Sequence, residues 1–246
     1  MRINKDRVMI LYSLGYPDNK IAKHLRVSPN GVGYVRQNIL KLPVVTKNIS
    51  ISKTQEEILI GTLLGDSSIV YVHSGCTMPH LQFCHCKAQE IYCKTKYNKL
   101  KILMSSCKER QYNKSLVIKG RVAKVQPVIY CIGKNLEVLK EYRNVFYPNG
   151  KKVIPISFIE DRFTAQSLAY LFMDDGCKNQ KSYNLNLQCF DYENLQEFAL
   201  FLERKFGIRS IVKKDKTIYI RYDSTKRMTE LIRPYITEDM QYKLQN

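Results

Sequence analysis

The stretch SLAYLFMDDG, residues 167–176, decides how the rest of the sequence is interpreted. It predicts a short helix, because two carboxylates and a glycine follow five apolar residues: Leu168, Ala169, Leu171, Phe172 and Met173. The run is too short for a membrane span and is typical of a buried core helix. The C-terminal end of a helix carries partial negative charge, so Asp174 and Asp175 require a positive charge nearby. By itself, the Asp-Gly pair is equally typical of an ordinary turn.

A second copy of the pattern favours a functional interpretation. Residues 57–68 read EILIGTLLGDSS, an apolar helix pattern that also finishes on a carboxylate, Asp66. Aligning Asp66 with Asp175 matches the apolar positions of the two stretches, so the chain is predicted to be duplicated. Two such helices related by a pseudo-twofold axis would bring both carboxylates to one end of their interface. Like charges held close are costly unless a metal ion lies between them.

Both stretches resemble the LAGLIDADG motif of homing endonucleases, in the monomeric type that carries two motifs. The resemblance implies an α/β (α+β) fold, a pseudo-twofold duplicated αββαββα saddle whose curved sheets lie in the major groove of DNA. It also implies that Asp66 and Asp175, at the eighth motif position, are catalytic and bind Mg²⁺. The backbone carbonyls of Gly65 and Asp174 would complete the metal sites.

The two copies depart from the motif in different ways. Neither carboxylate is affected by the departures, which are Thr62, Leu64 and Ser67 in the first copy and Tyr170 and Met173 in the second. Gly61 and Gly65 allow close helix approach from the first copy. The matching positions of the second copy carry Tyr170 and Asp174, so we expect an asymmetric contact between the helices.

Two lysines match the family in position. The run GKKVIP, residues 150–155, resembles the segment whose second lysine lines the active site, which implies that role for Lys152. The run RPYITEDMQYKLQN, residues 233–246, resembles the segment that supplies the lysine of the other half, Lys243. Such lysines would stabilise charge on the phosphate or assist a water network. Without the resemblance, both would be ordinary surface lysines.

Residues 1–48 are predicted to form a separate helix-turn-helix DNA-binding domain, with a linker to about residue 54. Gly15 ends a first helix, Asp18 caps a second and Ser28 caps a third. The third helix would enter the major groove. Its candidate DNA contacts are Asn30, Tyr34, Arg36 and Gln37, with Arg36 near phosphate. A small helical cap without DNA contact is the alternative.

The remaining chain is predicted to contain two halves, residues 55–155 and 156–246. In the first half the patterns predict strands at 69–72, 79–86, within 111–118 and within 125–132, and helices at 88–104 and 136–146. In the second half they predict strands at 182–190, 209–213 and 217–222, and helices at 192–206 and 224–232. Along 81–86, apolar and polar residues alternate, which predicts one packed and one outward face.

The charge balance predicts a polyanionic partner. Forty Lys and Arg against 22 Asp and Glu give a net charge of +18. Double-stranded DNA is favoured, because no segment concentrates the charge as a basic membrane helix would. The candidate base or phosphate contacts of the two halves are Gln82, Cys84, Cys86, Gln111, Asn186, Gln188, Lys213 and Arg221. Since the sequence shows no signal peptide and no run of about 18 apolar residues, we expect an intracellular protein, in the cytoplasm, the nucleoid or an organelle matrix. The resemblance to the two-motif type implies a monomer.

The cysteine and histidine spacing does not favour zinc. Several potential ligands crowd into one span, namely His73, Cys76, His80, Cys84, His85, Cys86 and Cys93. No pair among them has the Cys-x-x-Cys spacing of a structural zinc site. The other four cysteines, Cys107, Cys131, Cys177 and Cys189, are scattered along the sequence, so we expect reduced thiols.

Two functions remain open. The first is a site-specific endonuclease of the homing type, which makes a metal-dependent double-strand break in a long DNA target. The second is a binding protein that retains the scaffold without cleavage, either an RNA-splicing maturase or a transcription regulator. Retention of both Asp66 and Asp175 favours the endonuclease.

Overall fold

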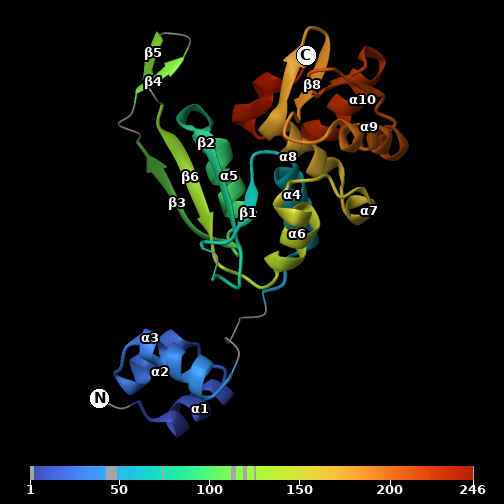
Figure 1. The fold of residues 1–246 in the computed structure, drawn as a ribbon. Coiled ribbons are helices and arrows are strands. Elements are labelled where there is room, and N and C mark those ends of the chain that lie inside the picture. The colour runs from blue at the N-terminus through green and yellow to red at the C-terminus, as the bar shows by residue number, and fades with distance from the viewer. Residues whose placement is uncertain are drawn as a thin grey trace. The chain divides into compact units, whose positions relative to one another are not determined.

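The computed structural model describes residues 3–42, 49–73, 75–111, 115–118, 121–124 and 126–245. The predicted linker therefore falls partly outside the described residues. The chain divides into two compact units, Met1–Ile49 and Ser50–Asn246, which are considered separately (Figure 1). No helix within these ranges is both long and apolar enough to cross a membrane.

The N-terminal unit is a small helical bundle. Its elements are α1 (Lys5–Ser13), α2 (Asp18–Leu25), α3 (Pro29–Tyr34) and η1 (Val35–Ile39), a π-helical turn that continues α3. Ser28 caps α3 as expected, because its side chain accepts a hydrogen bond from the backbone of Gly31. Asp18 differs slightly from expectation, since it is the first residue of α2 and Pro17 occupies the cap. The core consists of Val8, Ile21, Ala22, Val32 and Val35.

The larger unit is organised around the helices of the two motifs, α4 (Lys53–Leu64) and α8 (Ala165–Asp175). They pack side by side between the two larger sheets (Figure 1). Each begins with a capping box, Ser52 with Gln55 in α4 and Thr164 with Ser167 in α8. Gly61 is required at the crossing, because a Cβ there would collide with the Ser167 backbone.

The first half holds a four-stranded antiparallel sheet in the order β1-β2-β6-β3. Its strands are β1 (Ser68–Val70), β2 (His80–Cys86), β3 (Met104–Arg110) and β6 (Val128–Gly133). A two-stranded sheet joins β4 (Ser115–Ile118) to β5 (Arg121–Lys124). The helical segments are η2 (Lys87–Gln89), α5 (Glu90–Lys99), α6 (Leu139–Phe146) and η3 (Pro148–Gly150). Along β2 the predicted alternation is confirmed, since Leu81, Phe83 and His85 are buried while Cys84 and Cys86 are exposed.

The second half repeats this arrangement with a sheet in the order β7-β8-β10-β9. Its strands are β7 (Gly176–Asn179), β8 (Ser182–Asn186), β9 (Ser210–Val212) and β10 (Thr217–Ile220). The helical segments are α7 (Ile156–Ile159), α9 (Tyr192–Phe206), α10 (Tyr222–Ile232), η4 (Arg233–Tyr235) and η5 (Glu238–Lys243). The predicted bounds of α9 are confirmed, because Gly207 at φ +67° terminates the helix.

The clearest difference from the predicted elements concerns β3. The helix expected over 88–104 ends at Lys99, and Met104 already begins a strand that pairs with β6. The strand expected within 111–118 is confirmed as β4, which belongs to the small sheet, while 112–114 lie outside the described residues. β3 lies at the edge of its sheet and buries only its first residue, so its sequence lacks the alternation that identifies a half-buried strand.

Candidate active site

The C-terminal ends of α4 and α8 bring three carboxylates together. Asp66 follows the Gly65 cap of α4, whereas Asp174 and Asp175 are the last residues of α8. Burial and the neighbouring Asp174 raise the pKa of Asp66 to about 6. Burial, Asp66 and Asp174 raise the pKa of Asp175 to about 7. Both shifts come first from burial and second from the neighbouring negative charge, and a divalent cation would relieve the repulsion between the carboxylates.

Lys152 and Lys243 each donate to backbone carbonyls at the end of one motif helix. The Lys152 ammonium donates to the carbonyl oxygens of Gly65 at 2.7 Å and Ser67 at 3.4 Å. The Lys243 ammonium donates to the carbonyl oxygens of Met173 at 2.6 Å and Asp174 at 3.5 Å. Burial lowers the pKa of both lysines, although the nearby carboxylates oppose that effect. Each lysine therefore lies at the end of one motif helix, and together they supply positive charge of the kind that the helix ends require.

The donor atoms of this cluster suit a hard divalent cation. Carboxylate and carbonyl oxygens are the ligands that Mg²⁺ prefers, and Asp66 and Asp175 offer the carboxylates. The carbonyls of Gly65 and Asp174 lie within reach of the lysine ammonium groups, so a bound cation would compete with those lysines. The residues therefore fit a metal site of the predicted kind.

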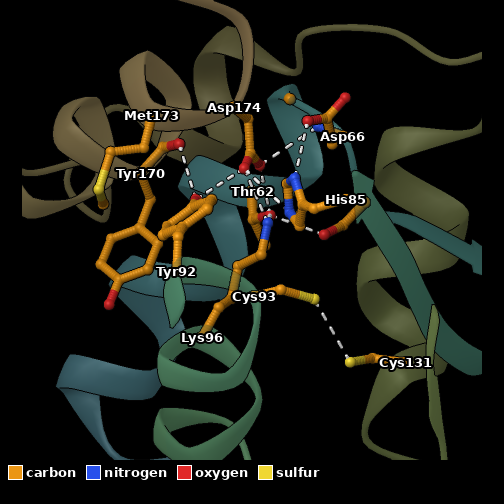
Figure 2. A network of polar contacts seen from close by, with 12 residues as sticks. Thr62, Asp66, His85, Tyr92, Cys93, Lys96, Cys131, Tyr170, Met173 and Asp174 are labelled. Atoms are coloured by element: carbon orange, nitrogen blue, oxygen red, sulfur yellow. Dashed lines mark hydrogen bonds and ion pairs between the residues drawn. The ribbon is translucent and has the colours of Figure 1, made fainter. Parts of the chain in front are cut away.

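The Asp174 side chain has a different environment from the other two carboxylates. It is fully buried and accepts four hydrogen bonds, from Thr62, Tyr92, Lys96 and the backbone N–H of Asp66 (Figure 2). Burial alone would raise its pKa, but Lys96 at 2.7 Å holds the pKa of Asp174 below its ordinary value. With these partners in place, Asp174 has little capacity left to bind a metal through its carboxylate.

The His85 imidazole lies close to the carboxylates of both Asp66 and Asp174. Its Nδ1 is 3.5 Å from Asp66 Oδ2, and its Nε2 is 3.6 Å from Asp174 Oδ1. Asp66, His85 and Asp174 lie close enough together for a metal-binding group, but the four donors on the Asp174 carboxylate leave that member little capacity for a metal ion. Burial and the charge of Lys96 lower the pKa of His85 to about 3, so the imidazole is neutral at physiological pH. A neutral imidazole is available to orient the Asp66 carboxylate.

An open cavity of about 440 Å³ lies beside Asp175. Lys243, Asn186 and Cys177 are among the residues that line it. Asn186, a predicted DNA contact, is therefore close to the candidate chemistry, where its amide donates to Cys177 Sγ at 3.5 Å.

The other predicted contacts of the two halves lie on or beside the sheets. Gln82, Cys84 and Cys86 share the outward face of β2, and the Gln82 side chain already binds Ser68 and Tyr130. The remaining side chains are at least partly exposed, with Gln111 directly after β3, Gln188 after β8, Lys213 after β9 and Arg221 before α10.

One of the predicted contacts of the N-terminal unit requires a correction. Asn30, Tyr34 and Gln37 are exposed along α3 and η1, as a reading helix requires. Arg36 is 5% exposed, and its guanidinium pairs with Asp18 at 2.8 Å and donates to the Leu42 carbonyl. Arg36 is therefore a poor candidate for the predicted phosphate contact, because this arginine ties α2 to the segment after η1.

Three cysteines from different segments meet in the first half. Cys93 on α5 lies 3.6 Å from Cys131 on β6, and Cys107 on β3 is the strand partner of Cys131. All eight cysteines are free thiols. Cys107 and Cys131 are distant in the sequence, so no spacing rule could have predicted this cluster.

Sequence reasoning also missed the roles of Thr62, His85, Tyr92 and Lys96 in the cluster. The sequence did indicate that Lys96 is buried. Its helical neighbours at three and four positions, Tyr92, Cys93 and Leu100, are apolar, which places Lys96 on the buried face of α5. A lysine within an apolar face requires a buried partner. No local signal identified that partner as Asp174.

Comparison with known proteins places most of the chain in one family. Residues 56–231 match the model of the LAGLIDADG DNA endonuclease family. The chain is 26% identical over its whole length to cytochrome b mRNA maturase bI2 of Saccharomyces cerevisiae and spans 58% of that protein. It is 29% identical to probable intron-encoded endonuclease 1 of Wickerhamomyces canadensis, over 79% of this chain and 85% of that protein.

The comparison of structures agrees with the sequence comparison. The homing endonuclease I-WcaI, solved bound to its DNA recognition sequence, superimposes with a TM-score of 0.68. The match covers 80% of this chain and 88% of that protein, at 28% sequence identity. The duplicated arrangement of motif helices and sheets is therefore shared with a protein of known structure.

Proposed function

Because the chain belongs to the LAGLIDADG DNA endonuclease family, we propose that it is a site-specific homing endonuclease that makes a Mg²⁺-dependent double-strand break in a long DNA target. The observation that carries the proposal is the pairing of Asp66 and Asp175 at the ends of two packed helices, each with a lysine that donates to backbone carbonyls at that helix end. A net charge of +18 supports a DNA partner.

The residues have distinct roles in this proposal. Asp66 and Asp175, with the carbonyls of Gly65 and Asp174, would hold one divalent cation for each scissile phosphate. Such cations, when bound, orient water and stabilise the attacking and leaving oxygens. Lys152 and Lys243 turn from those carbonyls toward the phosphate, where their ammonium groups stabilise developing negative charge. The outward faces of the two sheets follow the DNA grooves, and the chain acts as a monomer because it contains both motifs.

A maturase is the second candidate. The S. cerevisiae relative that aligns with the whole chain is a cytochrome b mRNA maturase. In this alternative the present chain would act on intron RNA, in an organelle matrix. The scaffold and the basic charge suit RNA as well as DNA, but maturation does not require two carboxylates with raised pKa values.

The experiment is to map cleavage of a randomised duplex library by the purified protein with Mg²⁺ or with EDTA. A unique double-strand cut that requires Mg²⁺ supports the proposal. Asp66→Asn and Asp175→Asn should each abolish that cut while target binding in Ca²⁺ persists. Cleavage at a normal rate by either variant contradicts the assignment. Splicing of the host intron RNA by a protein that never cuts DNA favours the maturase.

A further inference from the structure

The Asp174 carboxylate joins the two halves of the larger unit. It belongs to α8 in the second half, yet the four donors described above all come from the first half (Figure 2). The distances are 2.6 Å from Thr62 Oγ1, 2.6 Å from Tyr92 Oη, 2.7 Å from Lys96 Nζ and 3.2 Å from the Asp66 backbone N. An anion with four directed donors in a buried site is held in one position.

Two of these donors belong to the end of α4 that presents Asp66. The Asp66 N–H and the Thr62 hydroxyl both bind Asp174 Oδ2. Ser67 in turn shares a 2.6 Å hydrogen bond with Thr62. Gly65 makes the approach possible, since a Cβ there would lie 2.5 Å from the Cβ of Asp174. The carboxylate therefore holds the backbone of Asp66 in place, while its own backbone leads directly into Asp175.

The two side-chain donors from α5 fix the other oxygen of Asp174. Lys96 is fully buried, and its ammonium contacts the rings of Phe83 and Tyr92, at 4.7 and 4.8 Å from their centroids. It also donates to Thr62 at 2.9 Å. A buried ion pair is a poor source of stability compared with apolar packing, and in some proteins it is retained for the geometry that it defines.

Tyr92 connects the same network to the segment that carries Lys243. Its hydroxyl binds Asp174, and its backbone N–H donates to Asp239 Oδ2 at 2.9 Å. Asp239 belongs to η5, which ends at Lys243. One residue of α5 therefore contacts both the carboxylate between the motif helices and the segment that places the second lysine.

We infer that Tyr92 and Lys96 are positioning residues, which hold the Asp174 carboxylate so that Asp66 and Asp175 face the metal sites at a fixed separation. The inference rests on the proposed function, because it assigns the two residues to the same metal sites. The first motif copy has no carboxylate equivalent to Asp174, because Gly65 occupies the matching position. The Asp174 carboxylate and its donors thus align both sites.

The test compares two tyrosines that each donate to a carboxylate. Tyr92→Phe removes the hydroxyl on Asp174, and the matched control Tyr142→Phe removes a 2.8 Å hydrogen bond to Glu56 at the opposite end of α4. Both variants keep the ring and its packing. Metal affinity is measured directly, by electron paramagnetic resonance of free Mn²⁺ during titration of each full-length protein bound to its target duplex.

We expect Tyr92→Phe to weaken Mn²⁺ binding about 10-fold, the size of effect typical of a residue that orients a metal ligand, and Tyr142→Phe to bind as the wild type does. Equal Mn²⁺ affinity in Tyr92→Phe and the wild type overturns the inference alone. A wild-type protein that binds no Mn²⁺ overturns the inference together with the proposed metal sites. Equal weakening in both variants also overturns the inference, because a general loss of stability would then explain it.

The lysine is tested by a pair of substitutions. Lys96→Met leaves Asp174 without its counter-charge and should lose Mn²⁺ binding, while the double variant Lys96→Met with Asp174→Asn removes both charges and should recover part of it. No recovery in a double variant that is folded, as judged by circular dichroism, argues against a role for the ion pair. If the lysine variants do not fold, the Mn²⁺ affinity of Tyr92→Phe, compared with Tyr142→Phe and the wild type, still tests the inference.

Discussion

Replacing Asp175 with asparagine should make the metal-free protein more stable, even though it removes a proposed catalytic residue. The reason is that burial and two neighbouring carboxylates raise the pKa of Asp175 from 3.8 to about 7. Above that pH the folded protein must hold a carboxylate in an unfavourable place. The asparagine side chain carries no charge and leaves the shape of the site nearly unchanged.

The magnitude follows from proton linkage. Between the unfolded pKa of 3.8 and the folded pKa of about 7, the folded protein binds a proton that the unfolded chain has released. Stability of the wild type therefore falls as pH rises, by about 1.4 kcal/mol per pH unit. From pH 5 to pH 8 the loss is about 3 kcal/mol, nearly all of it below pH 7. Asp66 adds to the same trend, but its side chain is 39% exposed, so solvent screening reduces its share.

The assay is urea unfolding of the full chain in EDTA at pH 5, 6, 7 and 8, for the wild type and Asp175→Asn. The difference in unfolding free energy between them should grow by about 3 kcal/mol across this range in favour of the variant. Asp191→Asn is the control, because a hydrogen bond from Lys151 lowers the pKa of the exposed Asp191. The difference in unfolding free energy between Asp191→Asn and the wild type should therefore not change with pH above pH 5. Mg²⁺ should stabilise the wild type at pH 8 more than Asp175→Asn.

A difference that stays constant with pH would refute the reasoning, because Asp175 would then titrate alike in the folded and unfolded states. A difference that shrinks as pH rises would show that the folded protein favours the charged carboxylate. In that case the lysines, rather than the neighbouring acids, would dominate the environment of Asp175.

Three further predictions concern the lysines, the salt dependence and the N-terminal unit. Lys152→Ala and Lys243→Ala should slow single-turnover cleavage without changing target affinity, since these residues assist the chemistry without binding metal; unchanged rates in both would remove them from the site. Log affinity for the target should fall with log salt at about 0.9 per phosphate neutralised, and a flat dependence measured by filter binding would exclude DNA as the main partner. Deletion of residues 1–47 should weaken binding and shorten the footprint on one side only, because a linker of about a dozen residues reaches roughly 20 Å; an unchanged footprint would favour a role in autoregulation or packing.

The features that depend on neighbouring residues could be predicted from the amino-acid order. The helix cap at Ser28, the bounds of α9 and the alternation along β2 all rest on contacts within a few positions of the chain. The two apolar runs that end in Asp66 and Asp175 were visible for the same reason, and the duplication followed from comparing them.

The choice of partner for each buried charge depended on the packed fold. Lys96 and Asp174 are 78 positions apart, and Arg36 and Asp18 are 18 apart, so no periodicity connects either pair. The cluster of Cys93, Cys107 and Cys131 also depended on the packed fold, because its members are distant in the sequence. The edge strand β3 could not be predicted because its residues show little apolar alternation. The physical reason is burial, because a charged side chain in the interior requires a partner of opposite charge or a hydrogen bond. The packing of the two halves determines which residue lies close enough to be that partner.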